Sequence, residues 1–593
     1  MTPSPREPFV ALDFEGRDGG PARLVFRGPA ETVVARTVAE VRPALRAVER
    51  ATARGLYAAG FVAYEAAPAF DRALAAHDAD AATPLVWFAI FRGSAKDDTP
   101  RAAGDFKLTT WEPSVGRAAY DACVASVRES VARGDAYQVN YTLRLRARFE
   151  GDDFAFYRNL LAAQRGRYGA YLDTGTLRVL CASPELFFRR AGTRVVTRPM
   201  KGTSRRGLWP EEDEALSRRL FESEKNRAEN VMIVDLLRND LGRVALTGSV
   251  RVESLFDIER YPTVFQMTST VAAEVPPRTT LEEIFAALFP CGSVTGAPKV
   301  SATRIIKALE PEPRGVYCGA VGFVAPGGEA VFNVAIRTVV IDAETGAAVY
   351  GVGGGITWDS TAEGEYREAL DKAALLSERP AEFELLETMR LERGSYALRE
   401  RHLARLAASA RYFDVPLSLE SVRAALDEHA AAHRHEARRA RLLVSRRGEA
   451  RVESEPLVRL PAEPLPFALA RTPVPRRERF LYHKTTHRAV YESRRAQVGD
   501  VFDVLLWNEE GELTEFTNGN LVLEAPDGRL WTPPVECGLL AGTFRAELLA
   551  RGEVSERVLT CADLERAPRC WFVNSVRGRV RVTDVSRGRR ESV

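Results

Sequence analysis

The chain has 593 residues, too many for a single hydrophobic core, and its length predicts several domain-sized units. Its composition is that of an ordinary globular protein, with 45% hydrophobic and 28% charged residues and a formal net charge of +2, which gives no reason to expect nucleic acid or an anionic membrane as a partner. No apolar run approaches the ~20 residues of a membrane span, and the first residues lack the apolar segment of a signal peptide. We therefore expect a cytoplasmic protein.

Three residue types are unevenly used. The seven cysteines form no C-x-x-C pair and are odd in number, which argues against a disulfide framework or a structural zinc site. Only His77 precedes residue 380, so histidine is not expected as an acid or base in the first part of the chain. Eight of the 83 basic residues are lysines. Because arginine cannot act as an amine nucleophile, the surviving lysines are enriched for work that requires an amine.

The element pattern along the chain is typical of an α+β protein. Residues 8–100 combine short apolar strands with an amphipathic helix around 36–53, and residues 115–375 alternate helical stretches with β-branched runs. A charged cluster and Pro380 end this pattern, and a new strand begins at FELLETMRL. The predicted domains are therefore 1–378, with an N-terminal region of about 1–110 and a core of about 115–375, and 379–593.

Two polar residues of the first domain lie where packing alone would not place them. Glu185, in SPELFF, follows a proline and precedes three apolar residues, so we expect a partly buried carboxyl with a raised pKa that suits a general acid. A solvent-facing glutamate at a strand edge is the alternative. Lys201, in TRPMKGTSRRG, is expected in a tight turn with exposed backbone.

Acidic residues on two predicted helices complete this constellation. In 224–242, Met232, Ile233, Leu236 and Leu237 form an apolar stripe, and Glu229 one turn earlier is predicted to point inward. After a glycine-rich turn at 353–355, Glu365, Glu368 and Lys372 share one helical face. Glu229 and Glu368 together suit Mg²⁺, which prefers a few carboxylates plus substrate oxygens and water. An exposed, salt-bridged helix is the alternative for 365–372.

With GSVTGAPK (292–299), RGVYCGAVGF (314–323) and VAIRT (334–338), these segments resemble the chorismate-utilising enzymes. The resemblance covers about 115–375 and implies a large α+β sandwich with a Mg²⁺-dependent chorismate site. It implies that Glu229 and Glu368 bind the metal with Glu365 close by, and that Glu185 protonates the departing C4 hydroxyl. The positions implied to hold chorismate are Gln138, Thr203, Tyr317, Arg337, Gly353, Gly354, Gly355 and Lys372.

Two positions distinguish the subfamilies within this resemblance. Gln138 stands where water-adding isochorismate-type enzymes carry a base lysine, so ammonia is the implied nucleophile. The segment reads P-M-K-G-T where anthranilate synthases read P-I-A-G-T. In aminodeoxychorismate synthases this lysine, here Lys201, is thought to attack the ring at C2 before ammonia enters at C4. No G-x-C-x-G nucleophile turn is present, so a separate glutamine amidotransferase subunit is the implied ammonia source, with free ammonia as the fallback.

Residues 381–593 contain a single lysine, Lys484, which makes it a Schiff-base candidate. A hairpin-like turn with Glu515 follows, and then a Gly-Thr pair that opens a predicted helix whose amino terminus suits a phosphate. Taken separately, each piece is also compatible with an ordinary turn or helix start.

Their order resembles the fold-type IV enzymes that use pyridoxal 5'-phosphate (PLP), over nearly all of 383–585. The resemblance implies a D-amino-acid aminotransferase-like α/β unit of two subdomains. Lys484 matches the cofactor lysine, Glu515 the partner of the pyridine nitrogen, Arg405 a phosphate ligand, and Asn574 the substrate side. The remaining positions implied to bind the cofactor are Thr517, Asn518, Gly542 and Thr543. Type IV relatives usually dimerise, so a homodimer through this domain is expected.

The two resemblances together predict a bifunctional enzyme of 4-aminobenzoate synthesis for folate. The first domain would aminate chorismate, and the second, as an aminodeoxychorismate lyase, would release pyruvate. The cofactor residues are shared by lyases and aminotransferases, so the lyase assignment depends on the fusion. An aminotransferase, a non-catalytic assembly domain, and an anthranilate synthase-like first domain are the alternatives.

Overall fold

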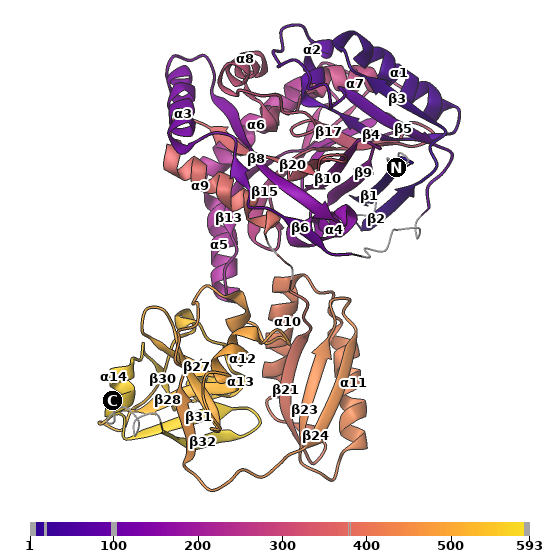
Figure 1. Cartoon of the computed structure of the whole chain (residues 1–593). Coiled ribbons are helices and arrows are strands. Elements are labelled where there is room, and N and C mark those ends of the chain that lie inside the picture. Colours follow the sequence, from indigo (N-terminus) through magenta and orange to yellow (C-terminus); the bar gives the residue numbers. More distant parts are fainter. Residues whose placement is uncertain (1–6, 17–19, 96–103, 378, 380, 586–593) are drawn as a thin grey trace. The chain divides into compact units, whose positions relative to one another are not determined.

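The computed structural model describes residues 7–16, 20–95, 104–377, 379 and 381–585 (Figure 1). The chain divides into two compact units: Met1–Arg206 with Ser217–Pro380, and Gly207–Leu216 with Ala381–Val593. The division is drawn after Pro380, close to the predicted one after 378; residue 378 itself lies outside the described residues. Across those same residues, no helix combines the length and apolar character that a bilayer span requires.

Two large antiparallel sheets form the first unit. The first has the order β16-β8-β20-β19-β10-β9-β1-β2, with β6 and β7 paired to β8. Its strands are β1 (Phe9–Glu15), β2 (Pro21–Phe26), β6 (Phe106–Leu108), β7 (Glu112–Pro113), β8 (Gln138–Gly151), β9 (Tyr168–Asp173), β10 (Leu177–Ser183), β16 (Gly296–Ala297), β19 (Thr338–Asp342) and β20 (Ala347–Ile356).

The second sheet has the order β13-β15-β12-β11-β18-β17-β4-β5-β3, with β14 paired to β15. Its strands are β3 (Glu31–Ala35), β4 (Tyr57–Val62), β5 (Val86–Phe91), β11 (Leu186–Ala191), β12 (Arg194–Arg198), β13 (Met200–Arg205), β14 (Arg251–Arg260), β15 (Val264–Glu274), β17 (Ala320–Val324) and β18 (Ala330–Val334). Strands from the N-terminal region and from the core therefore lie in both sheets, so the two regions share one fold.

The sheets face each other across an apolar core that includes Leu12 of β1, Phe61 of β4 and Val179 of β10. Helices cover the outer faces, because each sheet has a second apolar face to bury. They are α1 (Val38–Ala53), α2 (Ala67–Phe70), α3 (Arg117–Ala132), α4 (Asp153–Gln164), α6 (Glu224–Gly242), α7 (Leu281–Leu288), α8 (Lys299–Leu309) and α9 (Ala362–Ala373), while α5 (Pro210–Glu222) contains residues of both units. This arrangement confirms the predicted α+β sandwich.

Local signals explain where the helices begin. The predicted helix at 36–53 is α1, which starts after Thr37, where a capping box with Glu40 satisfies free backbone amides. Helix α9 starts after Thr361, whose hydroxyl accepts a hydrogen bond from the amide of Gly364. This start determines the phase of α9 and therefore which of its side chains face β20.

The second unit has two subdomains, as predicted. In the first, a sheet of order β22-β21-β23-β24 packs against two helices. These elements are β21 (Leu385–Glu392), β22 (Ser395–Tyr396), β23 (Arg438–Val444), β24 (Ala450–Pro456), α10 (Arg399–Phe413) and α11 (Leu419–Ala432).

The second subdomain contains a closed ring of strands, because β27 pairs with both β26 and β28 in the order β27-β26-β25-β32-β31-β28-β29-β30. Its elements are β25 (Leu465–Leu469), β26 (Asp503–Trp507), β27 (Leu513–Phe516), β28 (Gly519–Glu524), β29 (Leu530–Thr532), β30 (Ser555–Glu556), β31 (Arg569–Asn574), β32 (Gly578–Asp584), α12 (Ala489–Arg495), α13 (Thr543–Ala550) and α14 (Cys561–Arg566). Closure removes sheet edges and gives the loops around the ring a rigid support.

Candidate active sites

In the first unit, Lys201 and Gln138 meet over a glycine of β20. A β-carbon on Gly355 would lie 1.9 Å from Nε2 of Gln138 and 2.7 Å from Nζ of Lys201, so only glycine permits this approach. Burial lowers the pKa of the Lys201 amine, and Lys372 adds to this effect while Glu229 opposes it. A lysine so placed is more often neutral than a surface lysine and can act as a nucleophile.

Lys201 does not lie in the predicted turn. It belongs to strand β13, whose pairing with β15 shifts register between Met200 and Thr203. Gly202 within this bulge has a φ of 92°, in the left-handed region that favours glycine. The bulge supplies the irregular backbone that the sequence suggested, but within a strand. Similarly, residues 353–355 continue β20 instead of forming a turn, because each pairs with β8.

Gln138 is buried, and neither atom of its amide has a hydrogen-bond partner among the described residues. An unpaired buried amide costs free energy, so this side chain is poised to bond a ligand. The side-chain amide of glutamine does not take up a proton at neutral pH, so Gln138 cannot serve as a base.

The predicted burial of Glu185 is confirmed, because only 3% of the residue is exposed. Burial raises its pKa to about 7, against the opposing effects of a hydrogen bond from Ser293 and the charge of Lys201. Its Oε1 atom has no partner among the residues that the structure describes. A carboxyl that holds its proton near neutral pH is suited to general acid catalysis. Ser293 was missed as a site residue, although its motif was part of the resemblance.

One face of α9 carries Glu365, Glu368 and Lys372 toward Gly354, as predicted. A β-carbon there would lie 2.9 Å from Glu365 Oε2, 3.8 Å from Glu368 Oε1 and 3.6 Å from Lys372 Nζ. Lys372 pairs with Glu368 at 2.6 Å and donates to the carbonyl of Gly353 at 2.8 Å. The Lys372 charge lowers the pKa of Glu368, whereas burial raises the pKa of Glu365. Glu365 and Lys372 on this face are half-buried, whereas Glu368 is exposed and paired with Lys372, so the face is only partly covered.

The buried stripe of α6 differs from the predicted one. Ile233 and Leu237 are buried as expected, but Met232 and Leu236 are only half-buried, and the buried residue one turn earlier is Asn230. Asn230 donates from Nδ2 to the carbonyl oxygen of Lys201 at 3.4 Å. Its neighbour Glu229 lies at the stripe border, half-buried, because the helix phase is rotated by one residue from the predicted one. Its charge still raises the pKa of Lys201.

The other predicted chorismate residues differ in their surroundings. Tyr317 is buried and packs beneath Gly351. Arg337, with a φ of 54°, donates to the carbonyl of Lys372, which ties it to the carboxyl end of α9. Thr203 is exposed and donates to Oε1 of Gln266 at 2.9 Å. Arg337 thus brings a cationic side chain to the α9 residues.

The carboxylates fit a magnesium ion through two of the three predicted ligands. Glu365 and Glu368 lie together beside Gly354, and Mg²⁺ is commonly held by one or two carboxylates with substrate oxygens and water. Within the described residues, no group of three or more His, Cys, Asp or Glu side chains is gathered for a metal. Glu229 lies on α6, where its charge acts on Lys201, and its part in the metal site stays a prediction.

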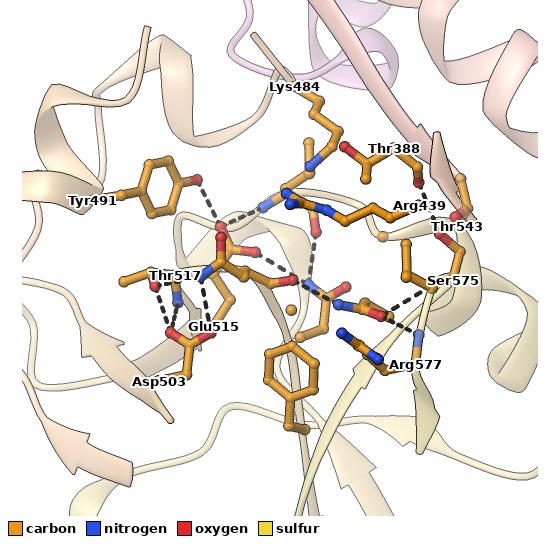
Figure 2. Close-up of a pocket in the computed structure, with 18 of the residues that line it drawn as sticks. Thr388, Arg439, Lys484, Tyr491, Asp503, Glu515, Thr517, Thr543, Ser575 and Arg577 are labelled. Atoms are coloured by element: carbon orange, nitrogen blue, oxygen red, sulfur yellow. Dashed lines mark hydrogen bonds between the residues drawn. The ribbon is translucent and has the colours of Figure 1, made fainter. Parts of the chain in front are cut away.

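The second unit contains a cavity of about 340 Å³ lined by Lys484 and all the other predicted cofactor residues (Figure 2). Burial lowers the pKa of the Lys484 amine to about 7, and the positive charges of Arg405 and Arg488 add to this effect. A buried amine that is neutral near pH 7 can form a Schiff base and can also accept a proton.

Glu515 lies in the same cavity, on β27. Its Oε1 accepts hydrogen bonds from Tyr491 Oη at 2.8 Å and from the amide of Leu540 at 3.1 Å, and its Oε2 accepts from Asn520 Nδ2 at 3.3 Å. Burial raises its pKa to about 7 despite these bonds. A cationic ring nitrogen placed against it would favour the ionised form.

The predicted phosphate end is built around the first turn of α13. Gly542 and Thr543 start the helix, and Asn520 approaches Gly542 so closely that a β-carbon would lie 1.8 Å from its Oδ1. Arg405 lines the cavity but is held by Glu387, with nitrogen–oxygen distances of 2.9 and 2.6 Å. The backbone amides of a helix start are suited to an anion, so the predicted phosphate role of this segment stays a prediction.

Glu387 was missed by the sequence reasoning. Burial opposes its ionisation, but Arg405 and His402 outweigh burial and lower its pKa to about 2. His402 bonds Glu387 through Nδ1 at 2.6 Å and Thr543 Oγ1 through Nε2 at 3.2 Å. One buried carboxylate thus positions both an arginine and the helix start. No local signal marked it, because its strand also carries the polar residues Thr388, Arg390 and Glu392.

Three predicted residues are tied to their surroundings. Thr517 donates its hydroxyl proton to Asp503, and Asn518 donates from Nδ2 to the same carboxylate at 3.1 Å. Asn574 donates to the carbonyl of Asn518 at 3.0 Å, and its Oδ1 accepts from the amides of Val576 and Arg577. All three line the cavity, where they shape its wall.

These residues fit PLP. The cavity offers an amine with a lowered pKa, a buried carboxylate to which no arginine of the described residues is bonded, and a helix start with Thr543 and Arg405 for a phosphate. Arg488 also lines the cavity and donates to the carbonyl of Thr517 at 2.6 Å. It was missed because nothing separates it by pattern from the many other arginines.

Comparisons with known proteins agree with both geometries. A family model described as a chorismate binding enzyme matches residues 12–378, and one described as amino-transferase class IV matches residues 384–585. Aminodeoxychorismate synthase component 1 of Salmonella typhimurium is 40% identical over 297 residues, which cover 50% of this chain and 63% of that protein. Anthranilate synthase component 1 of Aquifex aeolicus is 41% identical over 272 residues, covering 46% and 54%.

The crystal structure of anthranilate synthase component I from Streptococcus pneumoniae matches with a TM-score of 0.50 and 26% identity, over 64% of this chain and 94% of that one. The chain spans less than two thirds of the length of the two curated relatives, and overall identity does not separate the two activities they are named for. The first unit matches its family model over more than half of the whole chain. The chain therefore belongs to the chorismate binding enzyme family, and its second unit carries a fold-type IV aminotransferase-like domain.

Proposed function

We propose that the chain makes 4-aminobenzoate, a folate precursor, in two steps. The first unit converts chorismate and ammonia to 4-amino-4-deoxychorismate and water, with ammonia from a glutamine amidotransferase partner. The second unit converts that product to 4-aminobenzoate and pyruvate. The observation that carries the first step is the convergence of Lys201 and the unpaired amide of Gln138 on Gly355.

In the first step Lys201 supplies an amine and Glu185 a proton. The Lys201 nitrogen attacks C2 of the ring while the C4 hydroxyl leaves with the Glu185 proton as water. Ammonia then bonds to C4, and the bond to Lys201 breaks as the lysine returns to its free amine. Gln138 orients the nucleophile but activates no water. When bound, Mg²⁺ held by Glu365 and Glu368 would neutralise substrate carboxylates.

In the second step Lys484 would hold the cofactor, and its amine moves protons. PLP, when bound, supplies an electron sink that allows a carbon–hydrogen bond to break. Glu515 would hold the ring nitrogen protonated, and Gly542, Thr543 and Arg405 would hold the phosphate. Lys484, whose pKa is about 7, takes the proton whose loss permits departure of pyruvate and aromatisation.

One assay separates the proposal from an aminotransferase in the second unit, which the class IV match also allows. The purified chain receives chorismate, ammonium and Mg²⁺, with and without PLP. We expect pyruvate and 4-aminobenzoate only with PLP, and accumulation of aminodeoxychorismate without it. Accumulation of aminodeoxychorismate in the presence of PLP would refute the lyase step, and formation of anthranilate would refute the first step.

A further inference from the structure

Three arginines of the second unit lie close enough to repel one another, and two of them line the cavity. Arg390 on β21 and Arg439 on β23 are direct cross-strand partners. Arg577 lies in the turn between β31 and β32. Like charges directly opposite each other destabilise a sheet. The pairing of Arg390 with Arg439 therefore does not stabilise the fold, which suggests that the two charges serve to bind a ligand.

The third arginine adds to the repulsion. Burial lowers the pKa of Arg577, and the charges of Arg439 and Arg390 lower it further. Arg390 pairs with Glu392 at 2.8 Å and Arg439 with Glu455 at 2.7 Å. Arg577 donates to the carbonyl of Val458 at 2.5 Å, and no carboxylate is bonded to it within the described part of the chain. Two acids thus face three guanidinium groups.

Arg439 and Arg577 line the cavity that also contains Lys484 (Figure 2). They do not belong to the phosphate end, where Arg405 is already matched by Glu387 and the anion site is the start of α13. Arg439 and Arg577 are therefore cations of the cavity for which the cofactor phosphate does not account.

The turn that carries Arg577 is fixed by its neighbours. Asn574 accepts hydrogen bonds from the amides of Val576 and Arg577, at 3.0 and 2.7 Å. Ser575 donates to the carbonyl of Thr388 on β21 at 3.2 Å. The Arg577 backbone is thus held in place before any ligand arrives, which reduces the entropy cost of binding.

We propose that Arg577, together with Arg439, binds a substrate carboxylate that is remote from the reacting amine. This makes the second unit selective for amines that carry two carboxylates. Simple amino acids have one carboxylate, next to the amine. Aminodeoxychorismate has two, and neither is on the carbon that bears its amine. The inference rests on the proposed lyase function and names the residues that would distinguish its substrate from those of an aminotransferase.

The test uses the full-length chain loaded with PLP and supplied with aminodeoxychorismate. For Arg577→Leu we expect KM to rise about 10- to 100-fold, the effect of one lost charge-assisted hydrogen bond, with a smaller change in kcat. Arg577→Lys keeps the charge but loses the paired donors, so its KM should lie between those of the wild type and Arg577→Leu. The visible absorbance of the bound cofactor should be unchanged. Arg581→Leu, an exposed arginine on β32, is the matched control.

A binding measurement separates this inference from the lyase proposal. Benzene-1,3-dicarboxylate and benzoate are titrated against the loaded protein, with the cofactor absorbance as the signal. We expect the dicarboxylate to bind more tightly, and Arg577→Leu to remove that preference. Pyruvate release with a KM unaffected by Arg577→Leu would overturn the inference and leave the lyase standing. If no pyruvate is released but the preference for the dicarboxylate depends on Arg577, the lyase proposal is overturned and the carboxylate site stands.

Discussion

The two units each place one lysine in a buried site, yet the surrounding charges differ. Around Lys201 the interacting groups are mainly carboxylates, Glu229, Glu368 and Glu185, with Lys372 as the additional cation. Around Lys484 two arginines, Arg405 and Arg488, face the carboxylates Glu387 and Glu515. Burial is the largest cause of the lowered pKa in both.

The difference indicates which ligand each site requires. A carboxylate-rich site around an amine is balanced by a further cation, which suits Mg²⁺. A site whose lysine is flanked by arginines is balanced by an anion, which suits a phosphate and substrate carboxylates. Burial prepares both amines for nucleophilic chemistry, and the neighbouring charges decide which partner each one meets.

The largest effect should come from Lys484→Ala. Because Lys484 is the single lysine of residues 381–593, no other amine there can replace it. We expect pyruvate release to fall by roughly 10⁴-fold or more and the visible absorbance of lysine-bound PLP to disappear. Lys201→Ala should keep that absorbance. A Lys484→Ala protein that retains both signals would contradict the proposed role.

Next in size should be Lys201→Ala, with amination reduced by roughly 10³-fold or more while pyruvate is still released from added aminodeoxychorismate. Lys201→Arg should be equally inactive, since it keeps a charge but provides no nucleophilic amine. Lys225→Ala removes an exposed lysine of α6 and serves as the control. Normal turnover by Lys201→Arg would show that charge alone suffices and that the covalent role is wrong.

Glu185→Gln should reduce amination by about 10²-fold through loss of the general acid. The wild-type rate should decline as pH rises above about 7, where Glu185 loses its proton. The variant should lack this decline, and rates measured from pH 5 to 9 would show it. An unchanged pH profile in Glu185→Gln would assign the titration to another group.

The smallest effect concerns stability without PLP. The pKa of Glu515 is raised from 4.5 to about 7, so its protonated form stabilises the fold below pH 4.5, and this contribution is lost as pH rises through 7. At about 1.4 kcal/mol per pKa unit, the loss amounts to roughly 3 to 4 kcal/mol. Glu515→Gln should therefore reduce the decrease in melting temperature between pH 4.5 and 7.

Exposed Glu565→Gln is the matched control for that experiment and should melt as the wild type does. In wild-type protein loaded with PLP the decrease should also shrink, because a cationic ring nitrogen against Glu515 stabilises its ionised form. An equal pH dependence in wild type and Glu515→Gln would show that another group causes the decrease.

Sequence reasoning went furthest where a residue type is scarce or a motif is ordered. Lys201 and Lys484 stood out because arginine replaces lysine almost everywhere else, and Glu185 because its apolar neighbours demanded burial. The helical spacing of Glu365, Glu368 and Lys372 correctly placed them on one face, since helix geometry is local. The sandwich and the two-subdomain unit followed from recognisable motifs.

Tertiary structure decided what depends on residues far apart in the chain. The bulge that holds Lys201 arises from pairing between β13 and β15, and the phase of α6 arises from its packing. Gln138 and Gly355 meet Lys201 although they are 217 positions apart in the sequence and Lys201 belongs to the other sheet. Glu387, His402 and Arg577 carry no local signal, because their surroundings come from other elements. The sequence alone determined which side chains are available for the chemistry, whereas long-range packing decided which of them meet.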